Sequence, residues 1–158
     1  MLQSIPAPLH RIGLRLAHAL RKRWWRIAKP LLLGCRVLAL DGEGRLLLIR
    51  HSYGSDKWTL PGGGMARGED ALETARREFT EETGARLADA RLIAVHDEPL
   101  FGAINRVHVV AGRIEGVPQA DGREIAVLGC FSLGELPFPL ASSLSARLDE
   151  WLDAALER

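Results

Sequence analysis

The chain has 158 residues, of which 47% are hydrophobic and 26% are charged. This length suits one domain with a single sizeable core, and the composition is that of an ordinary globular protein. No apolar run approaches the roughly 18–20 residues that a helix needs to span a bilayer. These features argue against a helical integral membrane protein.

The basic residues are concentrated at the start of the chain. Residues 1–40 contain eight basic residues and no acidic residue, which leaves 13 basic against 20 acidic residues beyond them, a formal charge of −7. An acidic domain is poorly suited to gripping a nucleic acid duplex by its phosphates, so we expect no such partner. An excess of carboxylates is better matched to a protein that holds divalent cations.

Residues 9–28 are predicted to form a basic amphipathic helix that ends before Pro30. One face of this helix is an apolar stripe, and the opposite face carries arginine and lysine. Three interpretations stay open: the apolar stripe packs on the domain, the helix makes a weak membrane-surface contact, or the segment is a targeting peptide, with an organellar type fitting better than a secretory one. We assign residues 1–33 to this accessory helix and residues 34–158 to the main domain. The stripe consists of residues at steps of three and four: Leu9, Ile12, Leu16, Leu20, Trp24 and Ile27.

The main domain alternates strands and helices irregularly. Residues 35–40 and 45–51 read as a hairpin, and residues 58–60 as a short strand leading into the glycine-rich segment 61–64. A helix is expected over 69–83, with Gly84 at its end in a positive-φ conformation. Strands over 91–96, 105–114 and 124–132 follow, and then a helix over 144–155. This order indicates an α+β or α/β fold with helices on the faces of a mixed sheet.

The two cysteines, Cys35 and Cys130, both lie in apolar segments. Two isolated cysteines give neither a disulfide framework nor a metal-binding spacing. We predict buried free thiols in a reducing compartment, and therefore a cytoplasmic protein.

Three glutamates of the 69–83 helix are spaced so that they share one face. Glu78, Glu81 and Glu82 stand at i, i+3 and i+4, where like charges repel and weaken the helix. We expect no basic side chain on the same ridge, so an external hard cation, Mg²⁺ or Mn²⁺, would have to relieve the repulsion. A solvated acidic face is the alternative. The preceding Pro61-Gly62-Gly63-Gly64 favours a metal site, because glycines let the backbone approach a cation or a phosphate.

These residues resemble the Nudix box, G-x5-E-x7-R-E-U-x-E-E-x-G-U, in which U is a bulky apolar residue. The one departure is Ala85, where the family usually places a larger apolar residue. The resemblance extends over about residues 34–157 and leaves out the basic helix. The chain supplies the box positions as Gly63, Glu69, Arg77, Glu78, Phe79, Glu81, Glu82 and Gly84.

The resemblance implies an α/β/α sandwich and a metal-dependent hydrolase. Such an enzyme cleaves a pyrophosphate bond in a small substrate, a nucleoside diphosphate linked to another group: ADP-ribose, a nucleotide sugar or a nucleoside triphosphate. By similarity, Glu78 and Glu82 are the leading metal ligands, and Glu81 is a third ligand or the base that activates water. The Gly62 carbonyl resembles the family's backbone ligand. Arg77 and Glu69 resemble a pair that orients the glutamates, although a plain surface salt bridge is the alternative.

Other site residues are weaker candidates. Glu124 is the candidate for an additional base and Glu115 the runner-up, although both fit exposed surface glutamates. Arg50 and His51 either contact phosphate or are edge-strand residues, and Trp58 either stacks on a base or belongs to the core. The competing function is a non-catalytic module that binds a nucleotide or docks to a membrane or a protein. A homodimer is one assembly that the sequence allows.

Overall fold

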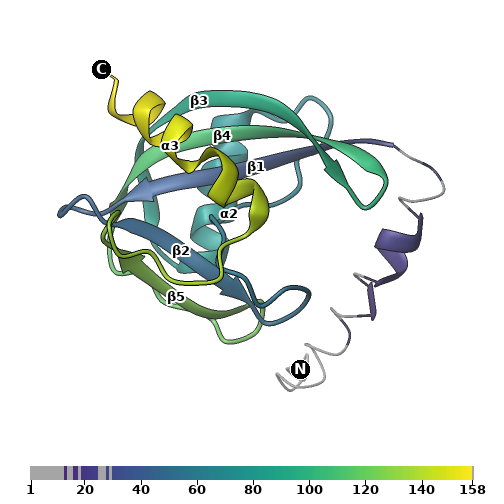
Figure 1. Cartoon of the computed structure of the whole chain (residues 1–158), viewed down its shortest axis with the longest axis horizontal. Helices are drawn as coiled ribbons and strands as arrows, with labels where there is room; N and C mark the ends of the chain where they lie inside the picture. The colour runs from purple at the N-terminus through teal and green to yellow at the C-terminus, as the bar shows by residue number, and fades with distance from the viewer. Residues whose placement is uncertain (1–12, 14–15, 18, 25–27, 29, 158) are drawn as a thin grey trace, which may run out of the picture.

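The computed structural model describes residues 13, 16–17, 19–24, 28 and 30–157. The fold is built on a mixed five-stranded sheet in the order β3-β4-β1-β2-β5, whose strands are labelled in Figure 1. Strand β1 is parallel to β4, and the other neighbouring strands are antiparallel. In chain order the elements are β1 (Leu31–Leu40), β2 (Leu46–His51), α2 (Ala71–Thr83), β3 (Arg86–Leu100), β4 (Ala103–Glu115), β5 (Ile125–Phe131) and α3 (Ser142–Leu156).

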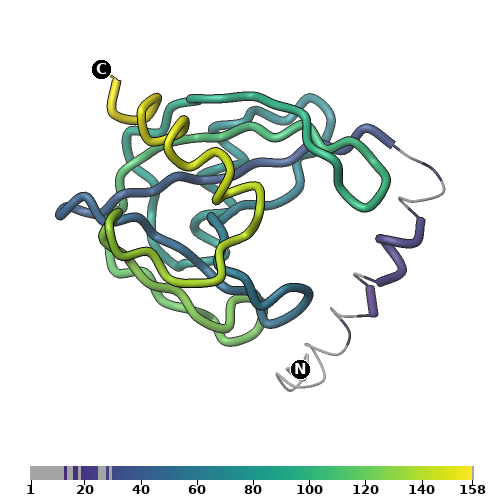
Figure 2. Tube along the Cα trace, viewed as in Figure 1, coloured from purple at the N-terminus to yellow at the C-terminus, as the bar shows by residue number. Residues whose placement is uncertain are grey.

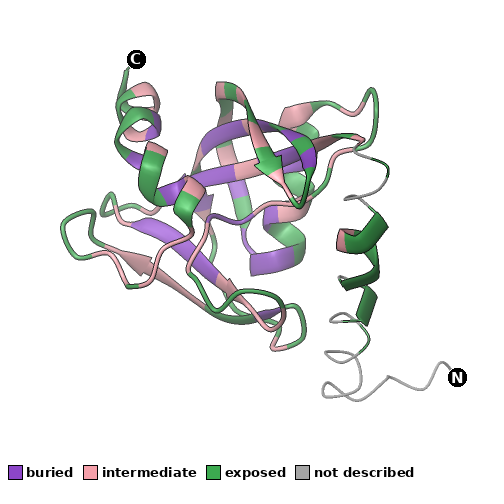
Figure 3. Ribbon diagram, turned by 45° about the vertical axis from the view of Figure 1, so that its right-hand side comes forward, coloured by how far each residue is buried: buried purple, intermediate pink, exposed green. Residues whose placement is uncertain are grey.

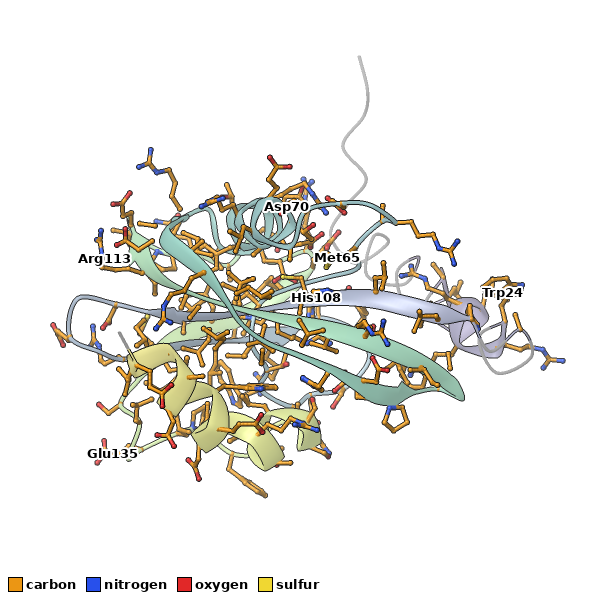
Figure 4. All side chains as sticks on the ribbon, turned by 90° about the horizontal axis from the view of Figure 1, so that it is seen from above. Trp24, Met65, Asp70, His108, Arg113 and Glu135 are labelled. Carbon is orange, nitrogen blue, oxygen red and sulfur yellow. The ribbon has the colours of Figure 1, made fainter. Side chains whose placement is uncertain are left out.

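The two helices cover opposite faces of the sheet, with α2 on one side and α3 on the other (Figure 4). Strand β1 is buried on both faces, which explains its nearly continuous apolar sequence. Its residues Cys35 and Val37 belong to the core beneath α2, whereas Leu38 belongs to the core beneath α3. This arrangement confirms the predicted α/β/α sandwich with a mixed sheet.

Local signals set the ends of α2. The side chain of Asp70 accepts hydrogen bonds from the amides of Leu72 and Glu73, at 2.9 and 3.0 Å, so the helix begins at Ala71 and not at residue 69. Gly84 has a φ of 70°, and its amide donates to the Thr80 carbonyl at 2.8 Å. The predicted positive φ at Gly84 is therefore confirmed.

Two strand predictions need correction. Residues 58–60 do not form a regular strand: Thr59 and Trp58 make only isolated bridges, to Ile49 and Leu140. Strand β3 is much longer than the predicted 91–96. Register shifts after Ala88 and after Leu92 interrupt the inward–outward alternation, so the hydrophobic pattern reveals only the middle of the strand.

Both cysteines are free thiols, as predicted. Cys35 is buried, whereas Cys130 is only partly buried because it lies on the edge strand β5. Burial raises the pKa of Cys35 to about 12, so this thiol is protonated and inert at neutral pH.

The described residues of the predicted N-terminal helix are helical, but the helix turns its apolar stripe outward. Leu16, Leu20 and Trp24 are 63%, 70% and 59% exposed, so the interpretation that they pack on the domain is wrong. Lys22 faces the domain instead, and its ammonium lies 4.2 Å from the ring centroid of Phe101. Figure 3 shows the helix as almost entirely exposed. Leu9, Ile12 and Ile27 lie outside the described residues.

None of the described helices is long and apolar enough to cross a membrane. The proposed boundary between residues 33 and 34 stays a prediction; the first strand of the sheet begins at Leu31.

We expect Trp151→Ala to lower the free energy of unfolding by roughly 3–5 kcal/mol, because the indole fills the core beneath α3 and its loss leaves a cavity. Chemical denaturation monitored by circular dichroism measures this difference. Phe138→Ala is the control, since Phe138 is 92% exposed and its removal should change stability by less than about 0.5 kcal/mol. Equal effects of the two substitutions would contradict the proposed packing.

Candidate functional site

The segment 61–65 is held along the first half of β1 by three backbone hydrogen bonds. The amides of Val37 and Cys35 donate to the carbonyls of Pro61 and Gly63, at 2.8 and 2.9 Å, and the amide of Met65 donates to Leu33 at 2.9 Å. These bonds use alternate residues of the segment. Of the two intervening residues, Gly62 and Gly64, Gly62 turns its amide toward Glu82 on α2.

Gly62 occupies a position that only glycine fits. Its φ is 145°, and an added Cβ would lie 2.1 Å from the carbonyl oxygen of Cys35. The Gly62 amide donates to Oε2 of Glu82 at 2.8 Å. Within the described residues, the Gly62 carbonyl accepts no hydrogen bond, so it is available as an oxygen ligand.

Glu78 lies over the next glycine of the same segment. An added Cβ on Gly63 would be 2.4 Å from Oε2 of Glu78, so the missing side chain leaves the space that this carboxylate occupies. Glu78 and Glu82 are one helical turn apart, and both face the glycine segment. The fold thus brings two of the three predicted glutamates together at Gly62 and Gly63.

Burial makes this pair costly to ionise. Glu82 is 8% exposed, and its burial, reinforced by the charges of Glu78 and Glu124, raises its pKa to about 8 despite the amide of Gly62. Burial also raises the pKa of Glu78, and the charges of Glu81 and Glu124 act in the same direction. A nearby cation would favour the ionised carboxylates.

Glu81 is exposed, and like Glu78 it lies beside Nη1 of Arg77. Within the part of the chain that the structure describes, no group of three or more His, Cys, Asp or Glu residues is arranged to hold a metal. The assignment of Glu78, Glu81 and Glu82 as metal ligands, and of Glu81 as the alternative base, stays a prediction. Two carboxylates and a backbone carbonyl still fit Mg²⁺, which usually takes one or two protein carboxylates and completes its shell with water and phosphate.

The guanidinium of Arg77 contacts three glutamate carboxylates. Its Nη1 lies 2.6 Å from Oε1 of Glu78 and 3.5 Å from Oε2 of Glu81, and its Nη2 lies 3.2 Å from Oε1 of Glu69. The expectation of no basic side chain on this ridge is therefore wrong, because Arg77 precedes Glu81 by one turn. Glu69 also accepts the amide of Ala66 at 2.9 Å, so the predicted pair joins α2 to the loop before it.

Glu124 and Glu115 lie in different surroundings. The charge of Glu124 acts on both Glu78 and Glu82, and its carbonyl accepts the amide of Ser52 at 2.9 Å. Glu115 instead pairs with Arg86 at 2.7 Å and with an arginine on its own strand. Only Glu124 is thus in electrostatic contact with the candidate site.

Arg36 is a site residue that sequence reasoning missed. Its charge lowers the pKa of Glu82, opposing the dominant effect of burial, while its Nη1 donates to the Cys35 carbonyl at 3.0 Å. The available signal was one charged residue inside an otherwise apolar strand.

The three candidate substrate-binding residues, Arg50, His51 and Trp58, do not share one environment in the structure. The guanidinium of Arg50 lies 5.5 Å from the ring centroid of Trp58, and Trp58 packs edge-on against Phe131, with centroids 5.1 Å apart. Trp58 thus joins the core beneath α3, as in the core interpretation. His51 lies instead beside Tyr53, with ring centroids 5.4 Å apart.

The Nudix domain family model matches residues 30–153, and the chain belongs to this family. It is 33% identical over 123 residues to a putative 8-oxo-dGTP diphosphatase of Bacillus subtilis, a match that covers 77% of this chain and 80% of the relative. It is 37% identical over 59 residues to an RNA pyrophosphohydrolase of Teredinibacter turnerae, covering 37% of this chain and 34% of that one.

Solved structures agree with this assignment. A MutT Nudix hydrolase from Burkholderia pseudomallei superposes with a TM-score of 0.68 at 28% identity, covering 76% of this chain and 97% of that one. The MutT protein of Methanosarcina mazei, at 22% identity and a TM-score of 0.69, shares the fold; its match covers 82% of this chain and 98% of that one. With its relatives, the chain is a hydrolase that acts on phosphoric anhydrides.

We expect Gly63→Ala to reduce hydrolysis by about 10–100-fold, the range typical of changes that reorient a metal-binding side chain. The new methyl group would occupy the position of the Glu78 carboxylate. Gly64→Ala is the matched control, because an added Cβ there meets nothing within 4 Å. Initial rates at several Mg²⁺ concentrations, together with melting curves, separate loss of the site from loss of the fold. Equal rates for the two variants would refute this account of Glu78.

The raised pKa of Glu82 predicts a pH-dependent stability of the metal-free protein. Because its pKa is about 8 in the folded state, against a reference value of 4.5, the stability that its proton provides is present below about pH 4.5 and is lost as pH rises through about 8. In chelator, the wild type should lose stability relative to Glu82→Gln across this window, measured by denaturant unfolding at each pH. Parallel curves would show that Glu82 titrates normally.

Proposed function

We propose that the protein is a divalent-metal-dependent pyrophosphohydrolase of a nucleoside diphosphate linked to another group. One observation carries this proposal: two partly buried carboxylates, Glu78 and Glu82, face a glycine segment whose Gly62 carbonyl is available. Among the three substrate types that the family resemblance implies, the nucleoside triphosphate is favoured by the B. subtilis relative, which is named a putative 8-oxo-dGTP diphosphatase. ADP-ribose and nucleotide sugars are the alternatives.

The proposed ligands are Glu78, Glu82 and the Gly62 carbonyl, and the proposed ion is Mg²⁺ or Mn²⁺. When bound, such an ion neutralises phosphate oxygens, lowers the pKa of water and orients it for attack on phosphorus. Nη1 of Arg77 lies 2.6 Å from Oε1 of Glu78. This contact favours a single orientation of the second carboxylate oxygen, Oε2. Arg77 is thus a positioning residue, and Glu69 supports it from the loop.

Glu124 is the proposed base. It is supported by the effect of its charge on Glu78 and Glu82 and by its position directly before β5. Glu124 would accept the proton of the attacking water as the new P–O bond forms. The bond from that phosphorus to the bridging oxygen breaks, and the leaving phosphate takes the bond's electron pair. Glu81 is the alternative base, since it too is exposed to solvent next to the pair.

The cellular setting belongs to the same proposal. The free thiols Cys35 and Cys130 support a reducing, cytoplasmic location. The exposed Leu16, Leu20 and Trp24 support a weak membrane-surface contact of residues 9–28. A homodimer stays a prediction without a specific contact in its favour.

We expect Glu82→Gln to reduce turnover by more than about 100-fold, beyond the range typical of residues that only support a metal ligand. The substitution keeps the size of the side chain but removes the charge that would hold the ion. The measurement is phosphate or pyrophosphate release from a panel of nucleoside triphosphates, ADP-ribose and nucleotide sugars with Mg²⁺.

Glu73→Gln is the control, because it removes the same charge from an exposed position of the same helix. If Glu82→Gln turned over substrate as fast as the wild type, the assignment of Glu82 to the catalytic site would be wrong. Equal turnover in chelator and in Mg²⁺ would sink the metal dependence.

A further inference from the structure

A cavity lies between the N-terminal helix and the loop that follows β2. Figure 2 shows these two segments on the same side of the molecule. The volume of the cavity is about 460 Å³, and its walls are Ala19 and Lys22 on the helix side and His51 with residues 53–56 on the loop side. This volume is in the range of pockets for small organic ligands, about 300–1,000 Å³.

The loop side of the cavity is joined to the candidate site at Ser52, which lies between the lining residues His51 and Tyr53. Its amide donates to the carbonyl of Glu124 at 2.9 Å. Burial raises the pKa of Tyr53, and the charges of Glu124, Glu82 and Glu78 act in the same direction, whereas Arg21 of the helix lowers it. A ligand in the cavity would therefore have one end toward the side of the domain that carries these carboxylates.

The lining groups suit a heterocyclic base. The rings of His51 and Tyr53 are 5.4 Å apart and tilted by 44°, which offers an aromatic surface for stacking. Ser55 and Asp56 add a hydroxyl group and a carboxylate, the groups that hydrogen-bond to the edge of a base. The carboxylate of Asp56 and the two rings make the cavity a better match for a base than for a bare phosphate.

Lys22 is the basic residue that the helix contributes to the lining of the cavity. It is partly buried, whereas its neighbours Arg21 and Arg23 are exposed. Its ammonium rests 4.2 Å from the centroid of the Phe101 ring, a contact that restrains the flexible side chain. A lysine ammonium carries N–H donors and no acceptor, so at the wall of the cavity it suits carbonyl or ring-nitrogen acceptors.

We propose that this cavity binds the nucleoside portion of the substrate, with the base on Tyr53 and with Lys22 donating hydrogen bonds to it. The N-terminal helix is then one wall of the substrate site and not an appendage. The inference rests on the proposed function, because the phosphates of the same molecule must reach Glu78 and Glu82. Lys22 contributes to binding and takes no part in the chemical step.

The first test uses the fact that Tyr53 is the single tyrosine of the chain. Incorporating 3-fluorotyrosine gives the full-length protein one ¹⁹F signal, located in the cavity. Nucleoside monophosphates are titrated in chelator, and ribose 5-phosphate and inorganic phosphate are titrated in parallel. We expect a saturable shift with at least one nucleoside monophosphate and none with the other two compounds. No shift with any base, or equal shifts with all compounds, would overturn the nucleoside assignment.

The second test compares two matched pairs of variants. Lys22→Ala should weaken nucleoside monophosphate binding and raise KM about tenfold while kcat stays within about twofold, the pattern for lost ground-state binding. Arg23→Ala removes the same charge from the next, exposed residue and should change neither quantity. Ala19→Trp should fill the cavity and raise KM, whereas Ala17→Trp on the same helix should not. Equal effects within either pair would refute the role of the helix.

Failure of this inference and failure of the proposed function give different results. If the wild type hydrolyses a nucleotide in Mg²⁺ and Lys22→Ala has an unchanged KM, the cavity assignment is wrong and the enzyme assignment stands. If no substrate is hydrolysed but the ¹⁹F signal responds to a nucleoside monophosphate and Lys22→Ala weakens that response, the cavity assignment stands and the function is wrong.

Discussion

The hydrogen bond from the Gly62 amide to Glu82 is the contact on which the rest of the site depends. It exists because residue 62 has no side chain: an added Cβ would clash with the Cys35 carbonyl at 2.1 Å. Because Gly62 lies close to β1, it holds the glycine segment against that strand, and its amide holds Glu82 of α2. Glu78, one turn earlier on α2, then lies over the adjacent Gly63. A larger residue at position 62 would therefore disturb the strand, the glycine segment and the helix together.

The site combines an excess of negative charge with incomplete compensation from the protein. Arg77 reaches Glu78 from the outside, and Arg36 acts on Glu82 from β1, yet the pKa values of both glutamates stay raised. Carboxylates that are costly to ionise without a partner favour a guest cation, since its binding relieves both desolvation and mutual repulsion. The same negative charge would repel a bare phosphate. We therefore expect the cation and the phosphates of the substrate to bind together.

Much of this could be predicted from local sequence, because the signals are local. Asp70 and Gly84 delimit α2, and the spacing of Glu78 and Glu82 on a helix predicts that they share a face. The orientation of Glu81 could not be predicted in this way: i, i+3 and i+4 positions span an arc wide enough for one member to face solvent. Arg36 and Tyr53 were missed because their relation to Glu82 depends on how distant segments meet. The register shifts in β3 hid most of that strand for a different reason, since they break the periodicity on which strand prediction relies.

Strand β1 connects the N-terminal helix to the glycine segment of the candidate site. Residue 28 is helical and β1 begins at Leu31, so few residues separate the two. The same strand supplies Leu33 and Cys35, which hold Met65 and Gly63 in register. One wall of the proposed nucleoside cavity and the glycine segment beside Glu78 and Glu82 are therefore connected through a single strand, β1.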